Sequence, residues 1–210
     1  METRYFQSRY SFDKRRTKVW RAICEYVQRF VNARGTTLDL GAGYCDFINN
    51  ITAERKIAVD LNSESGKYCN ENVKFYCSPI TNLEFIPDHT IDAVFMSNLL
   101  EHLENDQLEK TFQEIARVTK AHARLIILQP NYRYCFQEYF DDYTHLKAYS
   151  HISLCDFLTS VGYDIKRLEK RFLPFSFKSR LPMSYYLTKL YLSLPWKPFA
   201  KQMLIVAEKR

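Results

Sequence analysis

The feature that most constrains the fold is a short apolar segment that runs into two glycines. Residues 36–40 have the composition of a buried strand, and Gly41-Ala42-Gly43 follows at once. An apolar pattern with helical spacing begins at Phe47, and a second strand pattern at 56–60 ends in an acid, Asp60. A strand, a glycine turn, a helix and another strand in succession predict two parallel strands joined by a crossover helix.

The same alternation of strand and helix patterns continues to the end of the chain. The run at 90–96 is almost uninterrupted in its apolar character, as expected for a strand buried on both faces. Strands alternating with helices indicate an α/β fold with a mostly parallel sheet. We expect strands also at 72–77, 123–128, 163–165 and 202–207, and helices at 14–32, 108–116 and 150–161.

The length and composition fit a single domain, 1–210. The chain has 210 residues, of which 46% are apolar, and only five glycines and seven prolines. Three segments stand outside the alternation: a helical N-terminal segment at 1–35, an aromatic insert at 131–149 and a basic, aromatic insert at 171–200. Open α/β sheets place substrate recognition in such inserts when they follow a strand, so we expect 131–149 on the acceptor side.

Charge is distributed unevenly along the chain. The formal net charge is +6 over 1–35, −7 over 36–170 and +7 over 171–210. Basic ends favour an anionic partner such as a phosphorylated acceptor, a membrane surface or a nucleic acid, although a merely solvated surface has the same composition. No run approaches the roughly 18 apolar residues of a membrane span, and the N-terminus lacks the apolar core of a secretory signal. We therefore expect a cytoplasmic protein.

The six cysteines do not indicate a zinc or disulfide framework. None forms a Cys-x-x-Cys pair, and none stands at ligand spacing from a histidine. Carboxylates at Glu138, Asp141 and Asp142 have the chemistry to hold Mg²⁺, but no second acidic cluster accompanies them. The sequence therefore predicts no metal site.

The glycine turn and the acid after it have the pattern of a nucleotide-binding site. Glycines let the backbone approach a ligand closely, and an acid at the end of the next strand accepts hydrogen bonds from ribose hydroxyls. A hydride-transfer dinucleotide site is disfavoured because Asp46 stands where its third glycine belongs, and no Gly-Lys-Ser/Thr sequence of a P-loop is present.

Asp39-Leu40-Gly41-Ala42-Gly43, Asp60 and the segment 92–103 together resemble the class I S-adenosylmethionine-dependent methyltransferases. This resemblance implies a Rossmann-like sheet of seven strands, mostly parallel, with helices on both faces and the last strand antiparallel. The chain departs from the family pattern at Cys45, where a third glycine is common. The resemblance implies that S-adenosylmethionine is bound by Asp39, Gly41, Ala42, Gly43, Asp60, Leu61, Ser78, Ile80, Ser97 and Asn98.

A narrower resemblance concerns the acceptor. Gln129-Pro130-Asn131, Asp142-Tyr143-Thr144-His145 and the segments 172–174 and 178–182 are similar to methyltransferases of bacterial polysaccharide and lipopolysaccharide gene clusters. The resemblance implies O-methylation of a saccharide or glycoconjugate hydroxyl, on an acceptor that is anionic or lipid-linked. A small aromatic or isoprenoid acceptor suits the aromatic insert equally, and a non-catalytic assembly subunit is a third interpretation. Nucleic-acid methylation is disfavoured because Asn98-Leu99-Leu100-Glu101 lacks the proline pair of the base N-methylating enzymes.

Candidates for removing the acceptor's proton come from two histidines. His145 has Asp142 three residues before it, and the carboxylate is a candidate to fix the imidazole tautomer. His102 follows the strand at 90–96, and a structural role is the alternative for both. We expect Asn131, Tyr143 and Glu101 to contact the acceptor.

Residues 183–194 carry an apolar stripe at helical spacing: Met183, Tyr186, Leu187, Leu190, Tyr191 and Leu194. We favour a helix that covers the sheet edge or forms a homodimer contact. An interfacial helix at the inner face of a membrane is the alternative.

Overall fold

A seven-stranded sheet organises residues 13–174 and 183–210, which the computed structural model describes. The strand order is β3-β2-β1-β4-β5-β7-β6, and β7 is antiparallel to both of its neighbours while the other pairs are parallel. The expected sheet with an antiparallel last strand is therefore confirmed. The strands are β1 (Thr36–Leu40), β2 (Arg55–Asp60), β3 (Val73–Cys77), β4 (Ile91–Ser97), β5 (Thr119–Pro130), β6 (Tyr163–Glu169) and β7 (Gln202–Lys209).

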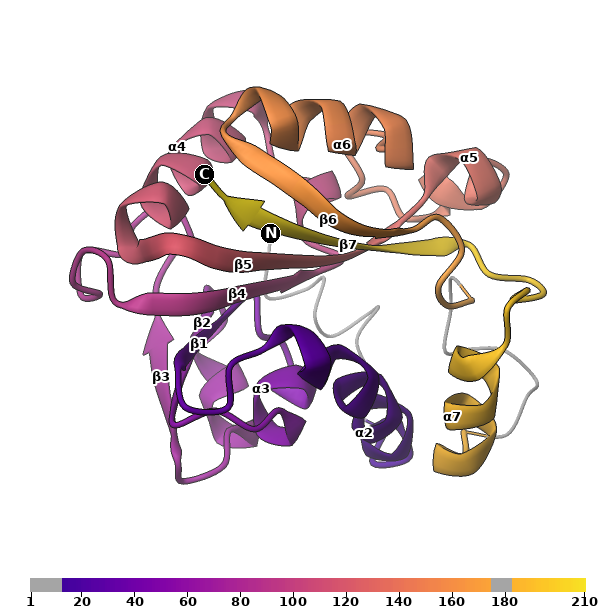
Figure 1. The fold of residues 1–210 in the computed structure, drawn as a ribbon, viewed down its shortest axis with the longest axis horizontal. Coiled ribbons are helices and arrows are strands. Elements are labelled where there is room, and N and C mark those ends of the chain that lie inside the picture. The colour runs from indigo at the N-terminus through magenta and orange to yellow at the C-terminus, as the bar shows by residue number, and fades with distance from the viewer. Residues whose placement is uncertain (1–12, 175–182) are drawn as a thin grey trace.

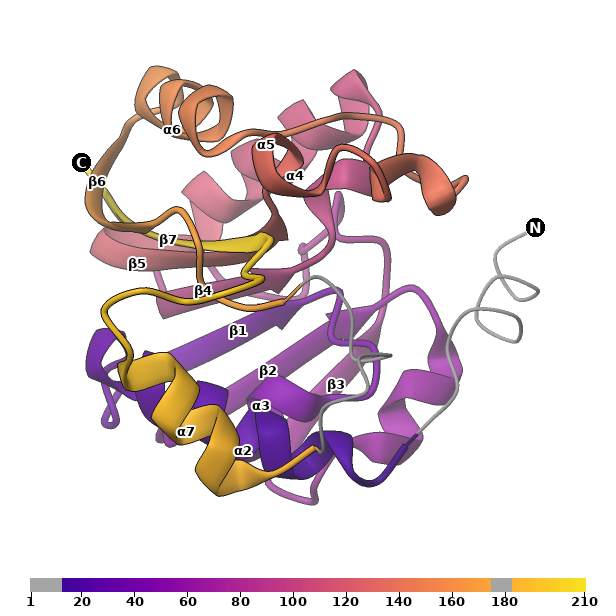
Figure 2. The ribbon, with the colours of Figure 1, turned by 90° about the vertical axis from the view of Figure 1, so that its right-hand side faces the viewer.

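Helices cover both faces of the sheet. Figures 1 and 2 show α4, α5 and α6 on one side and α2, α3 and α7 on the other. The α-helices are α2 (Arg16–Val27), α3 (Asp46–Asn50), α4 (Asn105–Val118), α5 (Tyr132–Cys135), α6 (His151–Ser160) and α7 (Tyr185–Ser193); the short 3-10 helices are η1 (Gln28–Phe30), η2 (Ser63–Tyr68), η3 (Leu100–His102) and η4 (Tyr139–Asp141). None of these helices has the length and apolar character that crossing a membrane requires.

The alternation of side chains along each strand creates two cores, one on each face. In β4, Val94 and Met96 belong to the core that contains Phe112 of α4. Phe95, between them, belongs to the opposite core and stacks on Phe47 of α3 with ring centroids 3.7 Å apart. Burying a large side chain of this kind contributes about 1.5–3 kcal/mol, so these two layers fix the sheet and the loops at its edges.

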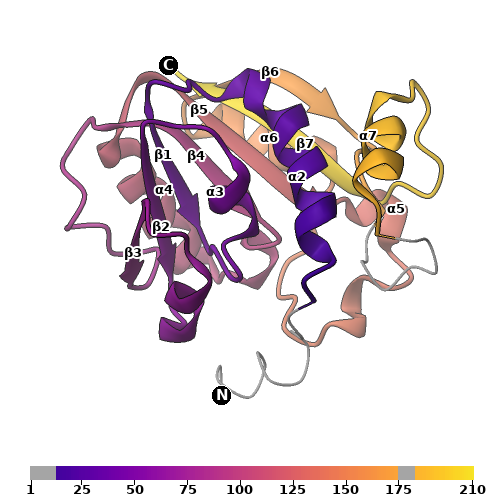
Figure 3. The same ribbon diagram turned by 90° about the horizontal axis from the view of Figure 1, so that it is seen from below.

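The helix α7 packs on α2 and leaves most of its predicted apolar stripe in solvent. Figure 3 shows α2 lying across the sheet, and α7 contacts it. Leu192 is buried in this contact, and the Tyr185 hydroxyl hydrogen-bonds to Glu25 of α2. Leu187 and Leu190, which we expected to cover the sheet edge or to form a homodimer contact, are 50% and 61% exposed, so they do not cover the sheet edge. Four residues of the stripe, Tyr186, Leu187, Leu190 and Leu194, are therefore exposed, whereas Met183 and Tyr191 pack against the core. Residues 178–182, which supported the narrower resemblance, lie outside the described residues.

Candidate functional site

The glycine turn between β1 and α3 adopts a left-handed backbone at three positions. Gly41 has φ +71° and Gly43 has φ +52°. A Cβ atom at Gly41 would lie 2.9 Å from Cδ1 of Leu99, which follows β4. Cys45, which stands where the methyltransferase pattern usually has a third glycine, adopts φ +56° as a non-glycine residue. The turn therefore keeps the glycine-like backbone that brings it close to the end of β4, despite the substitution.

Asp60 joins the glycine turn to the end of β2. Its Oδ2 accepts a hydrogen bond of 2.7 Å from the Gly43 amide, and its Oδ1 accepts one of 2.8 Å from the Asn62 amide. Each carboxylate oxygen can accept a second hydrogen bond, so Asp60 retains acceptor capacity for the hydroxyls of a ribose.

A second buried carboxyl lies beneath the turn. Asp39 is the fourth residue of β1, and burial raises its pKa well above the ordinary value, with the neighbouring Asp60 acting in the same direction. Two carboxyls placed so close together favour a cationic ligand. S-adenosylmethionine has a sulfonium and an ammonium group as well as a ribose, so the residues present fit this cofactor. Asp39, Gly41, Ala42, Gly43 and Asp60 would hold it.

Arg16 of α2 contributes to the turn, although no sequence pattern singled it out. Its Nη2 lies 2.9 Å from Oδ2 of Asp46, the first residue of α3, and its guanidinium lies over the Tyr44 ring. Both side chains of this ion pair are largely buried. The N-terminal helix is thereby attached to the loop that follows the glycines.

The other predicted cofactor residues surround the turn with different degrees of exposure. Ile80 is buried, whereas Leu61 is half-exposed. The Ser78 hydroxyl donates to the Asn82 carbonyl oxygen within its own loop, while its amide donates to the Asp60 carbonyl oxygen. Asn98, beside Ser97, has φ +48°, and its side-chain oxygen accepts a hydrogen bond of 2.8 Å from Gln202 of β7.

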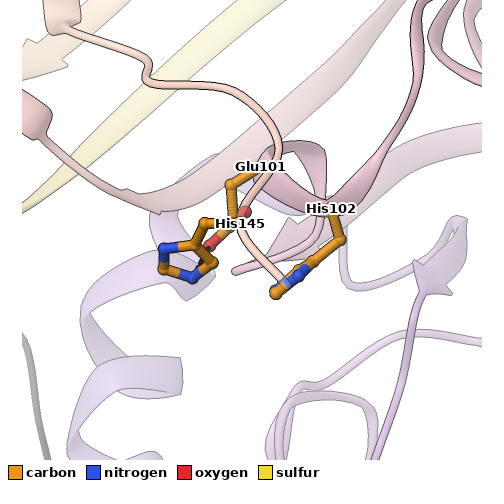
Figure 4. A group of neighbouring side chains, drawn as sticks. All are labelled: Glu101, His102 and His145. Atoms are coloured by element: carbon orange, nitrogen blue, oxygen red, sulfur yellow. Dashed lines mark ion pairs between the residues drawn. The ribbon is translucent and has the colours of Figure 1, made fainter. Parts of the chain in front are cut away.

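Three side chains gather at the carboxyl edge of the sheet (Figure 4). Glu101 and His102 belong to η3, directly after β4, and His145 comes from the segment that follows β5. Nε2 of His145 lies 4.0 Å from Oε1 of Glu101, whose side chain is completely buried. Burial raises the pKa of Glu101 to about 8, whereas burial and the neighbouring His145 lower the pKa of His102.

Thr144 connects Asp142 to His102. The Thr144 hydroxyl lies 2.7 Å from Oδ1 of Asp142 and 3.0 Å from Nδ1 of His102. If this hydroxyl donates to the carboxylate, its oxygen accepts from the imidazole, which leaves the His102 lone pair on Nε2. We expected Asp142 to orient His145, but the Nδ1 of His145 instead lies 2.6 Å from the Tyr139 carbonyl oxygen.

The sequence profile of the methyltransferase domain family matches residues 38–127. Over these residues the chain is similar to that family. The match runs from β1 into β5 and includes the glycine turn, Asp60 and His102. The predicted cofactor residues, from Asp39 to Asn98, all lie within the matched part of the chain.

Solved structures share this fold over nearly the whole chain. An S-adenosylmethionine-dependent methyltransferase from Archaeoglobus fulgidus superimposes with a TM-score of 0.69 and 21% identity, covering 99% of both chains. A Haloferax volcanii methyltransferase, solved with the Trm112 activator, gives a TM-score of 0.70 at 15% identity and covers 92% of this chain and 90% of its own. Phosphoethanolamine N-methyltransferase 1 of Triticum aestivum is 29% identical over 113 residues, which is 49% of this chain but only 22% of the wheat protein.

The insert at 131–149 differs from expectation at Asn131. We expected this residue to contact the acceptor, but it is fully buried. Its side-chain nitrogen donates to the Lys170 carbonyl oxygen at 2.9 Å and lies 3.1 Å from Nδ1 of His151. Asn131 therefore ties the insert to α6 and to the end of β6. Tyr143, by contrast, is 68% exposed, which leaves it accessible to an acceptor.

Proposed function

We propose that the methyltransferase transfers a methyl group to a hydroxyl of a saccharide or glycoconjugate. The observation that supports this proposal most directly is the cluster of Glu101, His102 and His145 beside the glycine turn. Leu99 contacts Gly41, and the cluster begins two residues later. A sugar hydroxyl is a poor nucleophile at neutral pH, so the site must make its proton easier to remove.

Bound S-adenosylmethionine supplies an electrophilic methyl group, and transfer forms an oxygen–carbon bond while the carbon–sulfur bond breaks and leaves its electron pair on sulfur. The chain has to position the hydroxyl oxygen and assist loss of its proton. Two routes suit the cluster. An imidazole nitrogen accepts the proton, or the developing oxygen charge is held beside a positive centre.

The surface around the cluster suits a ring-shaped acceptor. The insert exposes four apolar side chains, and the edge of a sugar ring packs on such aromatic faces. These exposed residues are Phe136, Phe140, Tyr143 and Leu146. A small aromatic or isoprenoid acceptor would use the same surface. The wheat relative, a phosphoethanolamine N-methyltransferase, adds phosphoethanolamine to the acceptors worth testing.

The open face of α7 supports an additional contact with a membrane surface. Tyr186, Leu187 and Leu190 are exposed on it, and Arg21 of α2 lies over the ring of Tyr185 at the edge of the same helix. Apolar residues bordered by basic ones suit an anionic bilayer. We propose that the enzyme works on the cytoplasmic side of the membrane, on a lipid-linked glycan.

A transfer assay with methyl-labelled cofactor tests this function. The acceptor panel comprises soluble saccharides, lipid-linked glycans, small phenols and phosphoethanolamine. We expect label in a saccharide fraction, with kcat reduced about 10²–10⁴-fold by His102→Ala or His145→Ala and cofactor affinity retained. His122→Ala, at an exposed position outside the cluster, is the matched control. Label confined to phenols or phosphoethanolamine would contradict the saccharide assignment, and absence of transfer to every acceptor would favour the assembly-subunit interpretation.

A further inference from the structure

Glu101, His102 and His145 have the composition of a metal-binding site (Figure 4). Each offers one ligand atom, and the three atoms lie within 4.8 Å of one another. Within residues 13–174 and 183–210, no other group of three histidine, cysteine or acidic side chains has this spacing. We propose that these three side chains bind one divalent metal ion of the Zn²⁺ type.

Both imidazoles are oriented as metal ligands are. Nδ1 of His145 lies 2.6 Å from the Tyr139 carbonyl oxygen, and Nδ1 of His102 lies 3.1 Å from the Thr144 carbonyl oxygen. A carbonyl oxygen only accepts hydrogen bonds, so each Nδ1 carries the proton and each Nε2 carries the lone pair. Metal-bound histidines characteristically donate their second ring N–H to a carbonyl or carboxylate, which fixes the tautomer.

The buried carboxylate provides the second and independent observation. Glu101 has no exposed surface, and within the described part of the chain neither of its side-chain oxygens has a hydrogen-bond partner. A charged carboxylate in the interior costs several kcal/mol unless it is compensated, and a bound cation would supply that compensation. The acidic run that the sequence suggested for Mg²⁺ is used differently, because Glu138 pairs with Lys201.

The donor set and spacing determine which ions suit the site. Zn²⁺ binds nitrogen and carboxylate oxygen at about 2.0–2.2 Å, which places neighbouring ligand atoms about 3.3 Å apart. The three atoms, now within 4.8 Å of one another, would therefore draw together by up to about 1.5 Å on binding. Two imidazoles with one carboxylate favour Zn²⁺, Fe²⁺, Co²⁺ or Ni²⁺ over Mg²⁺.

Three protein ligands leave a coordination position open, as in catalytic zinc sites. A metal held there would make a hydroxyl in the open position more acidic than in water, so that its proton could be released to solvent. This role rests on the proposed function. Of the two routes described there, it favours a positive centre that holds the developing oxygen charge over an imidazole that accepts the proton. Metal binding itself does not depend on the acceptor.

Co²⁺ binding to tag-free protein tests the site without cofactor or acceptor. We expect visible d–d absorption bands that saturate at one Co²⁺ per chain and disappear when Zn²⁺ competes. Isothermal titration with Zn²⁺ should show at least a tenfold loss of affinity in His102→Ala, His145→Ala and Glu101→Gln. His122→Ala, an exposed histidine outside the cluster, should bind Zn²⁺ like the wild type.

Absence of the Co²⁺ bands, or bands unchanged in all three variants, would overturn the proposal. If circular dichroism shows that the two variants at buried positions do not fold, His102→Ala decides alone, and wild-type Zn²⁺ affinity in it overturns the site. The two proposals fail separately. Metal binding without transfer to any saccharide refutes only the function, whereas full transfer by chelator-treated protein that binds no Co²⁺ refutes only the metal site.

Discussion

The backbone amide of Gly43 donates a hydrogen bond of 2.7 Å to the carboxylate of Asp60, which couples the glycine turn to the end of the neighbouring strand. The same carboxylate is the group that we expect to hold the ribose of the cofactor. We therefore expect one side chain both to shape the turn and to hold the ligand, so a change at Asp60 should weaken cofactor binding.

Asp60→Ala is expected to weaken binding of the demethylated cofactor by about 1.5–3 kcal/mol, because charge-assisted hydrogen bonds are lost. This corresponds to a roughly 10- to 150-fold rise in Kd by isothermal titration calorimetry. Asp164→Ala removes a half-exposed carboxylate that pairs with Arg210, and it should leave Kd unchanged. Equal Kd values for the two variants would show that Asp60 does not contact the cofactor.

Gly41→Ala and Gly162→Ala form a matched pair. Both glycines have a left-handed backbone, so each substitution adds about 1–2 kcal/mol of backbone strain. A Cβ at Gly162 meets nothing within 4 Å, whereas at Gly41 it meets Leu99. Both variants should melt at lower temperature, but only Gly41→Ala should lose cofactor affinity. The double variant Gly41→Ala/Leu99→Ala should melt at a higher temperature than Gly41→Ala alone. If its melting temperature does not recover, the destabilisation comes from the backbone and not from the contact with Leu99.

The sheet and the cofactor turn were predictable because their signals are local in sequence. The glycine turn with Asp60 and the apolar run of β4 each fall within one strand–helix step. Apolar alternation also identifies the two cores without knowledge of which elements meet. Strand ends were less predictable: β6 extends to Glu169 because it pairs with β7, which comes later in the chain.

For the candidate site, the sequence predicted which residues belong to it but not how they contact one another. Glu101 and His145 meet because two loops converge, and neither loop has a repeating pattern that fixes their distance. Which side chain Asp142 contacts was decided by one backbone turn. That turn places the Thr144 hydroxyl beside His102. Burial of Asn131 followed from its contact with α6. Such contacts are decided by tertiary packing and leave no signature in spacing.

An ion pair network at Arg117 gives a pH dependence of stability. Hydrogen bonding from Arg117 holds the pKa of Glu114 below its ordinary value. A lowered pKa in the folded state stabilises the fold above the unfolded pKa, and this contribution is lost as the pH falls through the folded value. Glu114→Gln should therefore lower the free energy of unfolding by about 1 kcal/mol at pH 7 and by less at pH 3, measured by urea denaturation.

The control for this prediction is Glu109→Gln, an exposed position on the same helix. It should change the unfolding free energy little at either pH. If Glu114→Gln destabilises the protein equally at pH 7 and pH 3, the contribution of Glu114 comes from packing rather than from its charge.

Substitutions on α7 distinguish a membrane-binding role of its exposed face from a structural role. Leu187 and Leu190 point into solvent, whereas Leu192 on the same helix is buried against α2. Leu187→Asp/Leu190→Asp should therefore leave the melting temperature nearly unchanged, and Leu192→Asp should lower it strongly, because it places a charge in the core.

Co-sedimentation with anionic vesicles then tests whether a membrane or a second copy of the chain covers that face. Each basic residue near such a surface contributes about 1 kcal/mol and apolar burial adds to it, so we expect wild-type binding at low salt that weakens at high salt. The double aspartate variant should stay in the supernatant. Because a second copy of the chain is the alternative occupant of the exposed Tyr186 and Leu187, sedimentation velocity is measured in parallel. A wild-type dimer that the same variant splits, with no vesicle binding by either protein, would assign the face to self-association and make a soluble saccharide the better acceptor.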